Sequence, residues 1–411
     1  MKKSLFAIAA VTAFAGAAQA QSSVTVYGIL DVGYVGGQTR VSNNAAQAKT
    51  NVSQFGQGAE TTNRLGFKGT EDLGGGMNAF FTAEFQLYPQ DQTLSGNTTS
   101  TTNNAGGLLN RQTFVGLSKK GIGQFALGTQ YTSVFSAQAA TDPGQTNNII
   151  GSITYPSATA VAAPGDANNQ AVTTAFTNRT SNTLSLASDT FAGFKASGFL
   201  TANSKTTSAT ATAGTVTAGG KTDSTGWGLR GEYTLQKFYI TAAYQALSQQ
   251  TSSVNVAAST PWTNAQANGA TTAPLATGTA VDVRDNQAYV GATYDFGILK
   301  AYAQYVNRKA TNTANTNYYL SRSGQQLGVR SFITPTIEGW ASIGNGRYRT
   351  FGENAPTANM NAWQLGSNYW LSKRTNLYAI YGQQNISQAA STTYSGSSNA
   401  NNYAVGVRHT F

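Results

Sequence analysis

The sequence predicts an all-β protein, a sixteen-stranded antiparallel transmembrane β-barrel with an inward-folded third loop. Three observations support this prediction: apolar and polar residues alternate along many segments, short connections alternate with long ones, and charged residues are few. Only 10% of the 411 residues are charged, against about 25% in typical soluble domains. The chain is therefore expected to have little ordinary water-facing surface.

The first twenty residues have the pattern of a secretory signal peptide. Lys2 and Lys3 precede an apolar stretch over residues 5–18, and Ala18-Gln-Ala20 supplies the small residues of a cleavage site. We expect residues 1–20 to be removed after export and residues 21–411 to form the barrel domain. Removing two lysines lowers the formal net charge of +10 by two, so the exported chain remains basic.

Strand alternation is clear after Met77, where apolar residues at odd positions are interleaved with polar residues such as Glu84. Because successive strand side chains point to opposite faces, such a strand has one apolar and one polar face. The same alternation predicts about sixteen strands. They begin near Ser23, Asn63, Met77, Leu109, Gly123, Asn178, Gly193, Thr225, Phe238, Val283, Ile298, Arg322, Glu338, Met360, Asn376 and Asn401.

The connections between these strands favour a membrane barrel. Tight turns on the periplasmic side and long loops outside are typical of an outer-membrane barrel. No segment after the first twenty residues has the ~18 consecutive apolar residues of a membrane helix, so strands are predicted to cross the bilayer. A barrel of about sixteen strands leaves an aqueous channel. The short connections span residues 71–76, 119–122, 189–192, 235–237, 295–297, 334–337 and 371–375.

Alternation also assigns charged residues to the inner face. Arg64 and Lys68 alternate with outward apolar residues, and Arg179 shares its phase with Ser181, Thr183 and Ser185. Arg111 instead shares its phase with apolar neighbours, so an inward Arg111 requires a bulge or a position at the rim. Tyrosines near strand ends, Tyr131 among them, suit an interfacial aromatic girdle. Further charges predicted to face the lumen are Asp31, Glu84, Arg230 and Arg408.

The connection between Tyr131 and Asn178 is unusually long, at about 45 residues, which points to a functional loop or to disorder. It contains two acids, Asp142 and Asp166, and no base before Arg179. If this segment folds into the lumen, it narrows the channel and brings its acids toward charges on the wall. An exposed loop is the alternative.

Five motifs in order along the chain resemble the trimeric general porins of betaproteobacteria. The resemblance spans the whole mature sequence. The motifs are Gln21-Ser-Ser-Val-Thr-Val-Tyr-Gly-Ile-Leu-Asp31, Arg64-Leu-Gly-Phe-Lys-Gly-Thr-Glu-Asp-Leu-Gly-Gly-Gly76, Arg111-Gln-Thr-Phe-Val-Gly-Leu117, Leu371-Ser-Lys-Arg-Thr375 and Val405-Gly-Val-Arg-His-Thr-Phe411.

The resemblance implies a homotrimer of sixteen-stranded barrels in which the third external loop forms an eyelet. It implies eyelet arginines at Arg64, Arg111 and Arg179, facing acids on the loop. The chain departs from the family at Thr129, where relatives often carry arginine, and it lacks the Pro-Glu-Phe stretch of many relatives. Asp142 is then the first candidate for the facing acid and Asp166 the second. The terminal Phe411 resembles the aromatic residue that the barrel-assembly machinery reads.

We therefore predict a general diffusion porin of the outer membrane that passes small hydrophilic solutes and ions, with weak to moderate anion preference. Outer-membrane lipids and the barrel-assembly machinery are its expected partners. A substrate-selective channel is one alternative, although Tyr239, Tyr289 and Tyr302 lie on separated strands and do not establish an aromatic path. A surface adhesin-like β protein is the other alternative, but it would not need alternating turn lengths.

Enzymatic and nucleic-acid-binding functions are not expected. The single histidine, His409, has no partner for a zinc site or a catalytic triad, and the chain contains no cysteine. The segment 226–231 has the spelling of a dinucleotide-binding loop, but it continues a strand pattern instead of opening a helix. Basic residues are scattered across strands and loops, unlike the basic face of a nucleic-acid-binding protein. No cofactor is expected.

Overall fold

The computed structural model describes residues 23–43, 46–90, 94, 109–155, 176–207, 210–212, 215–217, 220–253, 281–313, 316–353, 356–387 and 396–411. The predicted signal peptide and Asp166 lie outside these residues. The described part of the chain is almost entirely β-structure, with one helix of nine residues.

The first half of the chain contains β1 (Ser23–Asn43), β2 (Ala46–Gln57), β3 (Arg64–Gly74), β4 (Met77–Gln86), β5 (Leu109–Lys119), β6 (Gly123–Tyr131), α2 (Ser133–Thr141), β7 (Arg179–Ser188), β8 (Phe194–Thr207), β9 (Thr210–Thr212) and β10 (Thr215–Thr217). The second half contains β11 (Gly220–Leu235), β12 (Phe238–Ser253), β13 (Val281–Asp295), β14 (Lys300–Asn312), β15 (Tyr318–Phe332), β16 (Ile337–Glu353), β17 (Thr357–Trp370), β18 (Thr375–Ile386) and β19 (Gly396–Thr410).

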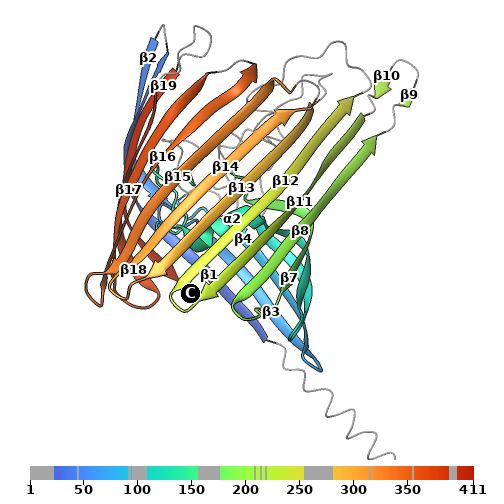
Figure 1. Cartoon of the computed structure of the whole chain (residues 1–411), viewed down its shortest axis with the longest axis horizontal. Helices are drawn as coiled ribbons and strands as arrows, with labels where there is room; N and C mark the ends of the chain where they lie inside the picture. The colour runs from blue at the N-terminus through green and yellow to red at the C-terminus, as the bar shows by residue number, and fades with distance from the viewer. Residues whose placement is uncertain are drawn as a thin grey trace, which may run out of the picture.

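The strands form a closed antiparallel barrel (Figure 1). Each strand pairs with its neighbours in chain order, and β8 pairs with β11 across the small β9–β10 hairpin. The barrel closes where β1 pairs with β19, from Ile29 opposite Thr410 to Asn43 opposite Gly396. Closure satisfies the backbone groups that an open sheet edge would expose to lipid.

The second wall position consists of two strands. The upper part of β1 pairs with β2, from Val32 opposite Gln57 to Asn43 opposite Ala46, and its lower part pairs with β3, from Ser23 opposite Thr70. Since β2 and β3 together make one descending wall element, the barrel has the sixteen positions that the sequence predicts. The predicted strands include none between those that begin near Ser23 and Asn63, so β2 was missed; its residues extend a hairpin with β1.

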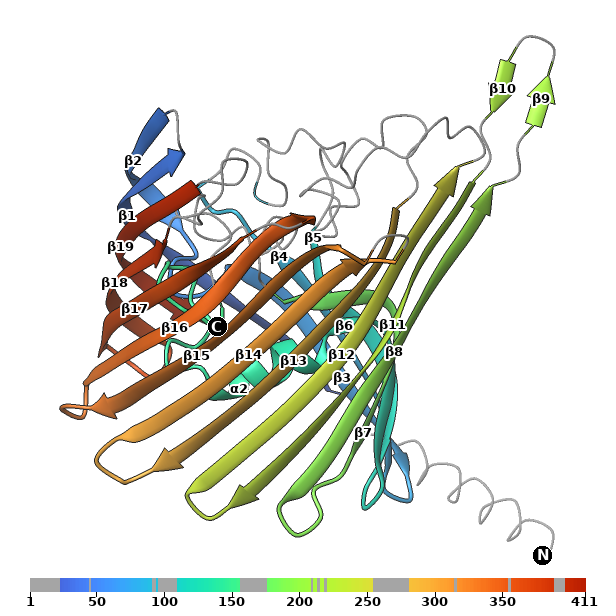
Figure 2. The same ribbon diagram turned by 45° about the horizontal axis from the view of Figure 1, so that its top comes forward.

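The two ends of the barrel differ. At one end, called here the short-turn end, tight turns join the strands; the opposite, long-loop end carries the longer connections (Figure 2). The turn between β3 and β4 is one of the tight ones, and Gly75 and Gly76 adopt φ of 59° and 76° there. Glycine adopts such left-handed conformations at little steric cost, and they match the twist of the paired strands.

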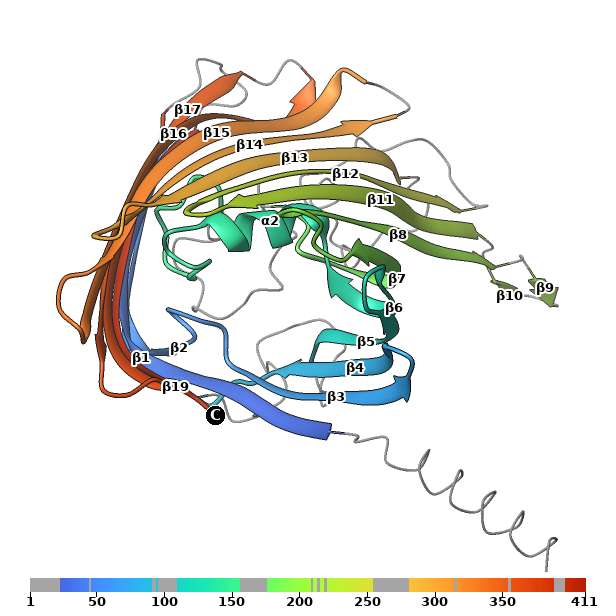
Figure 3. The same ribbon diagram turned by 60° about the horizontal axis from the view of Figure 1, so that its bottom comes forward.

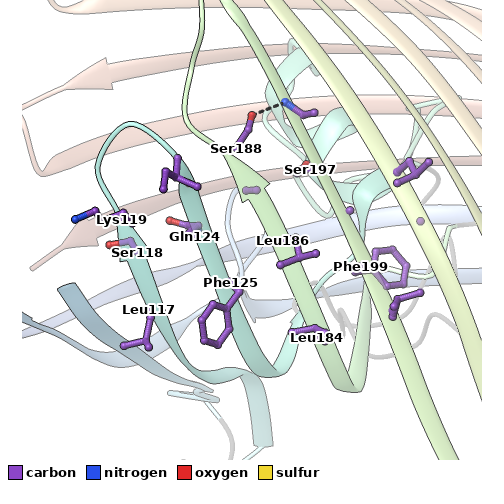
Figure 4. A pocket seen from close by; sticks show the side chains of 18 of the residues that line it. Leu117, Ser118, Lys119, Gln124, Phe125, Leu184, Leu186, Ser188, Ser197 and Phe199 are labelled. Carbon is purple, nitrogen blue, oxygen red and sulfur yellow. Dashed lines mark hydrogen bonds between the residues drawn. The ribbon is translucent and has the colours of Figure 1, made fainter. Parts of the chain in front are cut away.

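The outer face is apolar around the lower half of the barrel. Leu117, Phe125, Leu184 and Leu186 come from adjacent strands β5, β6 and β7 and lie side by side on this face (Figure 4). The inner face carries buried glutamine, asparagine and arginine side chains. No helix in the described part of the chain is long and apolar enough to cross a membrane.

Candidate functional site

Three arginines and one glutamate lie together on the inner wall formed by β3, β4, β5 and β7. Arg111 donates from Nε to Oε1 of Glu84 at 2.8 Å, and Arg64 Nη1 lies 3.7 Å from the same oxygen. Arg111 also donates to the hydroxyl of Tyr131 at 3.1 Å, and the Arg179 guanidinium lies 5.4 Å from the Tyr131 ring centroid. Three positive charges therefore lie near one carboxylate, and two of them contact it. We call these four charged residues the arginine cluster.

A β-bulge turns Arg111 inward. Glu84 pairs with Gln112 and the next residue, Phe85, pairs with Asn110, so Arg111 is the extra residue on β5. A bulge leaves one residue unpaired and interrupts the alternation of faces. Arg111 is consequently buried at the cluster, in spite of the apolar phase of its sequence neighbours.

A second irregularity lies near Arg179. The register between β6 and β7 slips between Gly128 and Gln130, and Asn182 has a positive φ of 52°. Thr183 is fully buried while Ser181 is exposed, so the prediction that these residues share one face with Arg179 was wrong in detail. Arg179 reaches the cluster through its stacking on the Tyr131 ring, and Tyr131 itself packs against Phe135 of α2 instead of joining an outer girdle.

Residues 58–63, between β2 and β3, fold against the inner wall, which the sequence does not predict. One Asp31 oxygen accepts from the backbone N–H groups of Glu60 and Thr61 at 2.9 and 2.7 Å, and the other accepts from the Tyr378 hydroxyl at 2.6 Å. Asp31 faces inward as predicted by alternation, but it is fully buried. Its charge holds this segment in place and is not presented to the lumen.

The other charges predicted to face the lumen have local partners. Arg408 lies 3.5 Å from a carboxylate oxygen of Glu60. Arg230 forms an ion pair with Glu232 and donates to the Tyr239 hydroxyl at 3.0 Å. Lys68 is exposed, and its ammonium lies 5.5 Å from the ring centroid of Tyr27.

The sequence analysis did not predict two further ion pairs on the inner wall. Arg308 pairs with Asp285 at 2.7 Å, and Arg330 forms a two-point contact with Glu338. Arg330 and Glu338 lie near one another across the tight turn between β15 and β16. Pairing these two strands through the predicted turn would have predicted this ion pair. Arg322 is buried on the same inner face and adds a positive charge. Among the described residues, no group of three or more His, Cys, Asp or Glu side chains is placed to hold a metal.

The third loop enters the barrel through α2 (Figure 3). Thr132 caps this helix, since its hydroxyl accepts from the Phe135 N–H at 3.3 Å. The helix is fixed to the wall at both ends: the Val134 N–H donates to Gln245 at 3.1 Å, and the Thr141 and Tyr289 hydroxyls are 2.7 Å apart. The expectation of an inward-folded third loop is met for residues 132–155.

Beyond α2, the loop follows the inner wall of β15 to β19. Gln364 donates to the Ile149 carbonyl at 2.6 Å, and Gln326 accepts from the Ile153 N–H at 2.7 Å. Asn148 donates from its backbone N–H to the Ala59 carbonyl at 2.9 Å. The loop and the segment 58–63 therefore support one another, each supplying hydrogen bonds that the wall alone does not provide.

Asp142 lies under this loop and does not face the arginine cluster. Its side chain is buried, one oxygen accepts from the Thr146 N–H at 2.6 Å, and the other accepts from Gln326 at 3.4 Å. Burial raises the pKa of this carboxyl to about 6. The expectation that Asp142 presents an acid to Arg64, Arg111 and Arg179 therefore differs from the structure, because the loop backbone and Gln326 take up its oxygens.

Comparison with known proteins identifies the family. The family described as Gram-negative porin matches residues 7–389. The chain belongs to the Gram-negative porin family. This porin is 28% identical over 443 residues to an outer membrane porin protein of Bordetella pertussis, with all of both chains covered. Over 98 residues, 23% of this chain and 25% of the relative, it is 46% identical to outer membrane porin protein 32 of Delftia acidovorans.

Solved structures have the same fold as this porin. The anion-selective porin from Comamonas acidovorans superposes with a TM-score of 0.61 at 21% identity, covering 95% of this chain and all of that one. OmpF of Salmonella typhi superposes with a TM-score of 0.55 at 15% identity, over 94% of this chain and 97% of the other. The porin is accordingly an outer-membrane protein, and its resemblance to betaproteobacterial porins is confirmed by the Bordetella and Delftia relatives.

Proposed function

We propose that this porin is a general diffusion channel for small hydrophilic solutes and ions, and that its arginine cluster gives it an anion preference. One observation carries the preference: Arg64 and Arg111 share the carboxylate of Glu84, and Arg179 lies beside them on the Tyr131 ring, so that three positive charges stand near one negative charge. The pairs of Arg230 with Glu232, and of Arg330 with Glu338, each contain one base and one acid. Arg308 and Arg322 lie beside the single acid Asp285, which leaves an excess of one positive charge. The arginine cluster has an excess of two, and we assign it to the constriction.

The size of the effect follows from electrostatics. A unit charge about 4 Å from an ion contributes roughly 1 kcal/mol in water. Arg64 exposes 19% of its side chain while Arg111 exposes 4%, so permeating ions approach Arg64 more directly than Arg111. Screening over about 8 Å at physiological salt reduces the field across the channel. We infer a preference of several-fold that weakens as salt rises, in keeping with a structural relative that is named an anion-selective porin.

We include Lys68 with Arg64, Arg111 and Arg179 among the residues that set the ionic field at the constriction. Lys68 lies on the same inward phase of β3 as Arg64, four residues nearer the short-turn end, and its side chain is exposed. Ions that pass the cluster would then meet a second positive charge.

We further infer that the protein functions as a homotrimer after removal of residues 1–20. Support comes from a solved relative, OmpT of Vibrio cholerae, that is described in a trimer form. We also propose Phe411 as the signal for the barrel-assembly machinery. Its side chain is 42% exposed on the outer face, and its backbone exchanges two hydrogen bonds with Gly28 at the barrel seam.

A substrate-selective channel has less support. Such a pore would need a path of accessible aromatic rings along the lumen. Tyr289 is fully buried, and its hydroxyl contacts Thr141 and Gln304. Tyr239 donates to Glu232 at 2.6 Å. These tyrosines are occupied in holding α2 and an ion pair, which favours a non-specific channel.

Single-channel recording in a planar bilayer tests the proposal. We expect purified protein to give ohmic openings, and the reversal potential in a potassium chloride gradient to have the sign of an anion-preferring pore. The preference should decline with increasing salt. A cation-preferring reversal potential would reject the role of the arginine cluster, and an electrically silent protein would reject the channel itself.

The carboxyl group of Asp142 in the third loop predicts that the ion preference depends on pH. Because the pKa of Asp142 is raised to about 6, this group is mostly neutral at about pH 5 and mostly charged at about pH 7.5. Losing a negative charge at low pH leaves the positive charges of the lumen less opposed. We therefore expect a modestly greater anion preference at the lower pH, measured from reversal potentials. The Asp142→Asn variant should abolish this shift; an equal shift in the variant would assign it to another group.

A further inference from the structure

The connection between β2 and β3, residues 58–63, is longer than the barrel wall requires. β2 ends with Gln57 opposite Val32, and β3 begins with Arg64 opposite Ile29, so only two residues of β1 lie between the two pairings. Six residues span that gap, which is four more than a continuous antiparallel strand would use. The chain therefore leaves the sheet, and Figure 3 shows the blue segment that joins β2 to β3 on the inner side of the wall. We call residues 58–63 the ledge.

Several wall strands hold the ledge by hydrogen bonds and an ion pair. Asp31 of β1 accepts from the backbone N–H groups of Glu60 and Thr61 at 2.9 and 2.7 Å. The Glu60 carboxylate accepts from Asn376 of β18 at 3.0 Å, and Arg408 of β19 lies 3.5 Å from it. Both carboxylates are buried, whereas Thr61 is half-buried. The ledge therefore directs its one charged side chain to the wall and presents an uncharged surface to the lumen.

The ledge lies at the level of the third loop and of the arginine cluster. Asn148 of the loop donates from its side-chain amide to the Gly58 carbonyl at 2.6 Å and to the Thr62 hydroxyl at 3.1 Å. The Thr62 carbonyl in turn accepts from Nε of Arg64 at 3.1 Å. Because Arg64 belongs to the arginine cluster, consecutive hydrogen bonds connect the loop, the ledge and the cluster.

The ledge also faces α2 across the lumen. The α2 residue Val134 and the residue that ends the helix, Thr141, are hydrogen-bonded to β12 and β13, while the ledge is held by β1, β18 and β19. With β2 and β3 counted as one position and the β9–β10 hairpin left out, eight steps lead from β1 to β12 in either direction around the sixteen positions. The two segments therefore stand on opposite sides of the barrel, as Figure 3 shows.

We propose that the ledge is a second constriction element, which narrows the channel from the barrel seam while the third loop narrows it from the opposite wall. The inference rests on the proposed channel function and specifies the shape of its pore. The narrowest section is bounded by the loop, the ledge and the wall that carries the arginine cluster, and the contact of Asn148 with the ledge joins the first two. Since the ledge surface is uncharged, it limits the size of solutes, and the arginine cluster supplies the charge.

The first test removes the ledge and keeps the strand. Deleting residues 59–62 takes out the four surplus residues, so that β2 and β3 become one continuous strand along β1. The even number leaves Arg64 on the inner face, and Asp31 retains Arg408 opposite it on β19 as a partner. A chain segment packed on a sheet occupies roughly 5–10 Å of depth, so single-channel conductance in a planar bilayer should rise about 1.5-fold or more.

Glu60→Gln is the matched control for the deletion. It removes the same negative charge and keeps the ledge, so its conductance in concentrated salt should equal that of the wild type. Heat-dependent migration on a gel shows whether each barrel assembles. Unchanged conductance in an assembled deletion variant would overturn the proposal. Wild-type openings in the same recordings establish the channel independently, so that result would leave the channel function intact.

The second test needs no shortened chain. The protein contains no cysteine, and the Thr61→Cys variant places one thiol on the half-buried residue of the ledge. A water-soluble methanethiosulfonate reagent, added to an open channel, should lower the current in discrete steps of roughly a third, because the attached group occupies part of the narrowest section. The wild type should not respond. A constant current after complete labelling, verified by mass spectrometry, would overturn the proposal even where the deletion variant fails to assemble.

Discussion

The double substitution Arg64→Gln/Arg179→Gln is expected to remove most of the anion preference of this porin. This double variant keeps the hydrogen bond of 2.8 Å between Arg111 and Glu84, so no buried carboxylate is left without its partner. Breaking that ion pair would cost about 3–5 kcal/mol of folding free energy. A folding defect would then be indistinguishable from a change in the electrostatic field of the channel. Removing two charges that each contribute roughly 1 kcal/mol to a nearby ion should reduce the anion-to-cation permeability ratio about fivefold.

Reversal potentials in a salt gradient measure this change, and one control variant fixes its meaning. Arg230→Gln/Glu232→Gln removes an ion pair of zero net charge and should leave the ratio unchanged. An unchanged reversal potential in Arg64→Gln/Arg179→Gln, with normal conductance, would show that ions do not pass near the cluster.

Replacing Gly382 by valine is expected to lower single-channel conductance. A Cβ atom at this position of β18 would lie 1.6 Å from the backbone carbonyl oxygen of Ile150, a contact that cannot exist without movement. The loop backbone must leave the wall and move toward the lumen, because the strand is held on both sides by ladders with β17 and β19. Displacing the loop also strains the bonds from Gln364 to the carbonyls of Ile149 and Ile150.

Conductance and current noise of purified protein measure the displacement. Gly231→Val on β11 is the matched control, since a Cβ atom there meets nothing closer than 3.9 Å, and its conductance should equal that of the wild type. Heat-dependent migration of the folded barrel on a gel confirms that each variant assembles. Wild-type conductance in a folded Gly382→Val variant would mean that the loop does not bound the conducting path.

Much of the barrel was predictable because the alternation of apolar and polar residues is visible within the sequence of each single strand. A strand with one face in lipid and one in water must alternate, and short turns such as Gly75-Gly76 mark where it reverses. The tight turns of the short-turn end and most strand positions therefore follow from residue order alone. Strand β2 was missed because its polar residues, beyond the apolar band, lack a contrast between faces. Residues such as Asn51 and Lys49 read as loop, although they pair with Gln38 and Arg40.

The site was predictable in part. Arg64 and Glu84 follow simple alternation and meet on the inner wall. Arg111 joins them only through a bulge, whose presence depends on how β4 and β5 pair and not on the sequence of β5 itself. Asp142 was recognisable as an acid of the inserted loop, but its direction was not. The loop backbone and Gln326, distant in sequence, decide that it is buried.

By itself, the sequence determined that this chain is a barrel with a wet interior, an apolar exterior and an inserted loop. Those properties depend on the order of apolar and polar residues along single strands, so the sequence of each strand is enough to show them. The tertiary structure alone decided which charged side chains lie close together and which are paired with an opposite charge. Two examples are the hydrogen bonds that hold residues 58–63 against Asp31 and the excess of arginine around Glu84. Electrostatic contacts of a few ångströms join strands far apart in the chain, so they exist only once the register of every ladder is set.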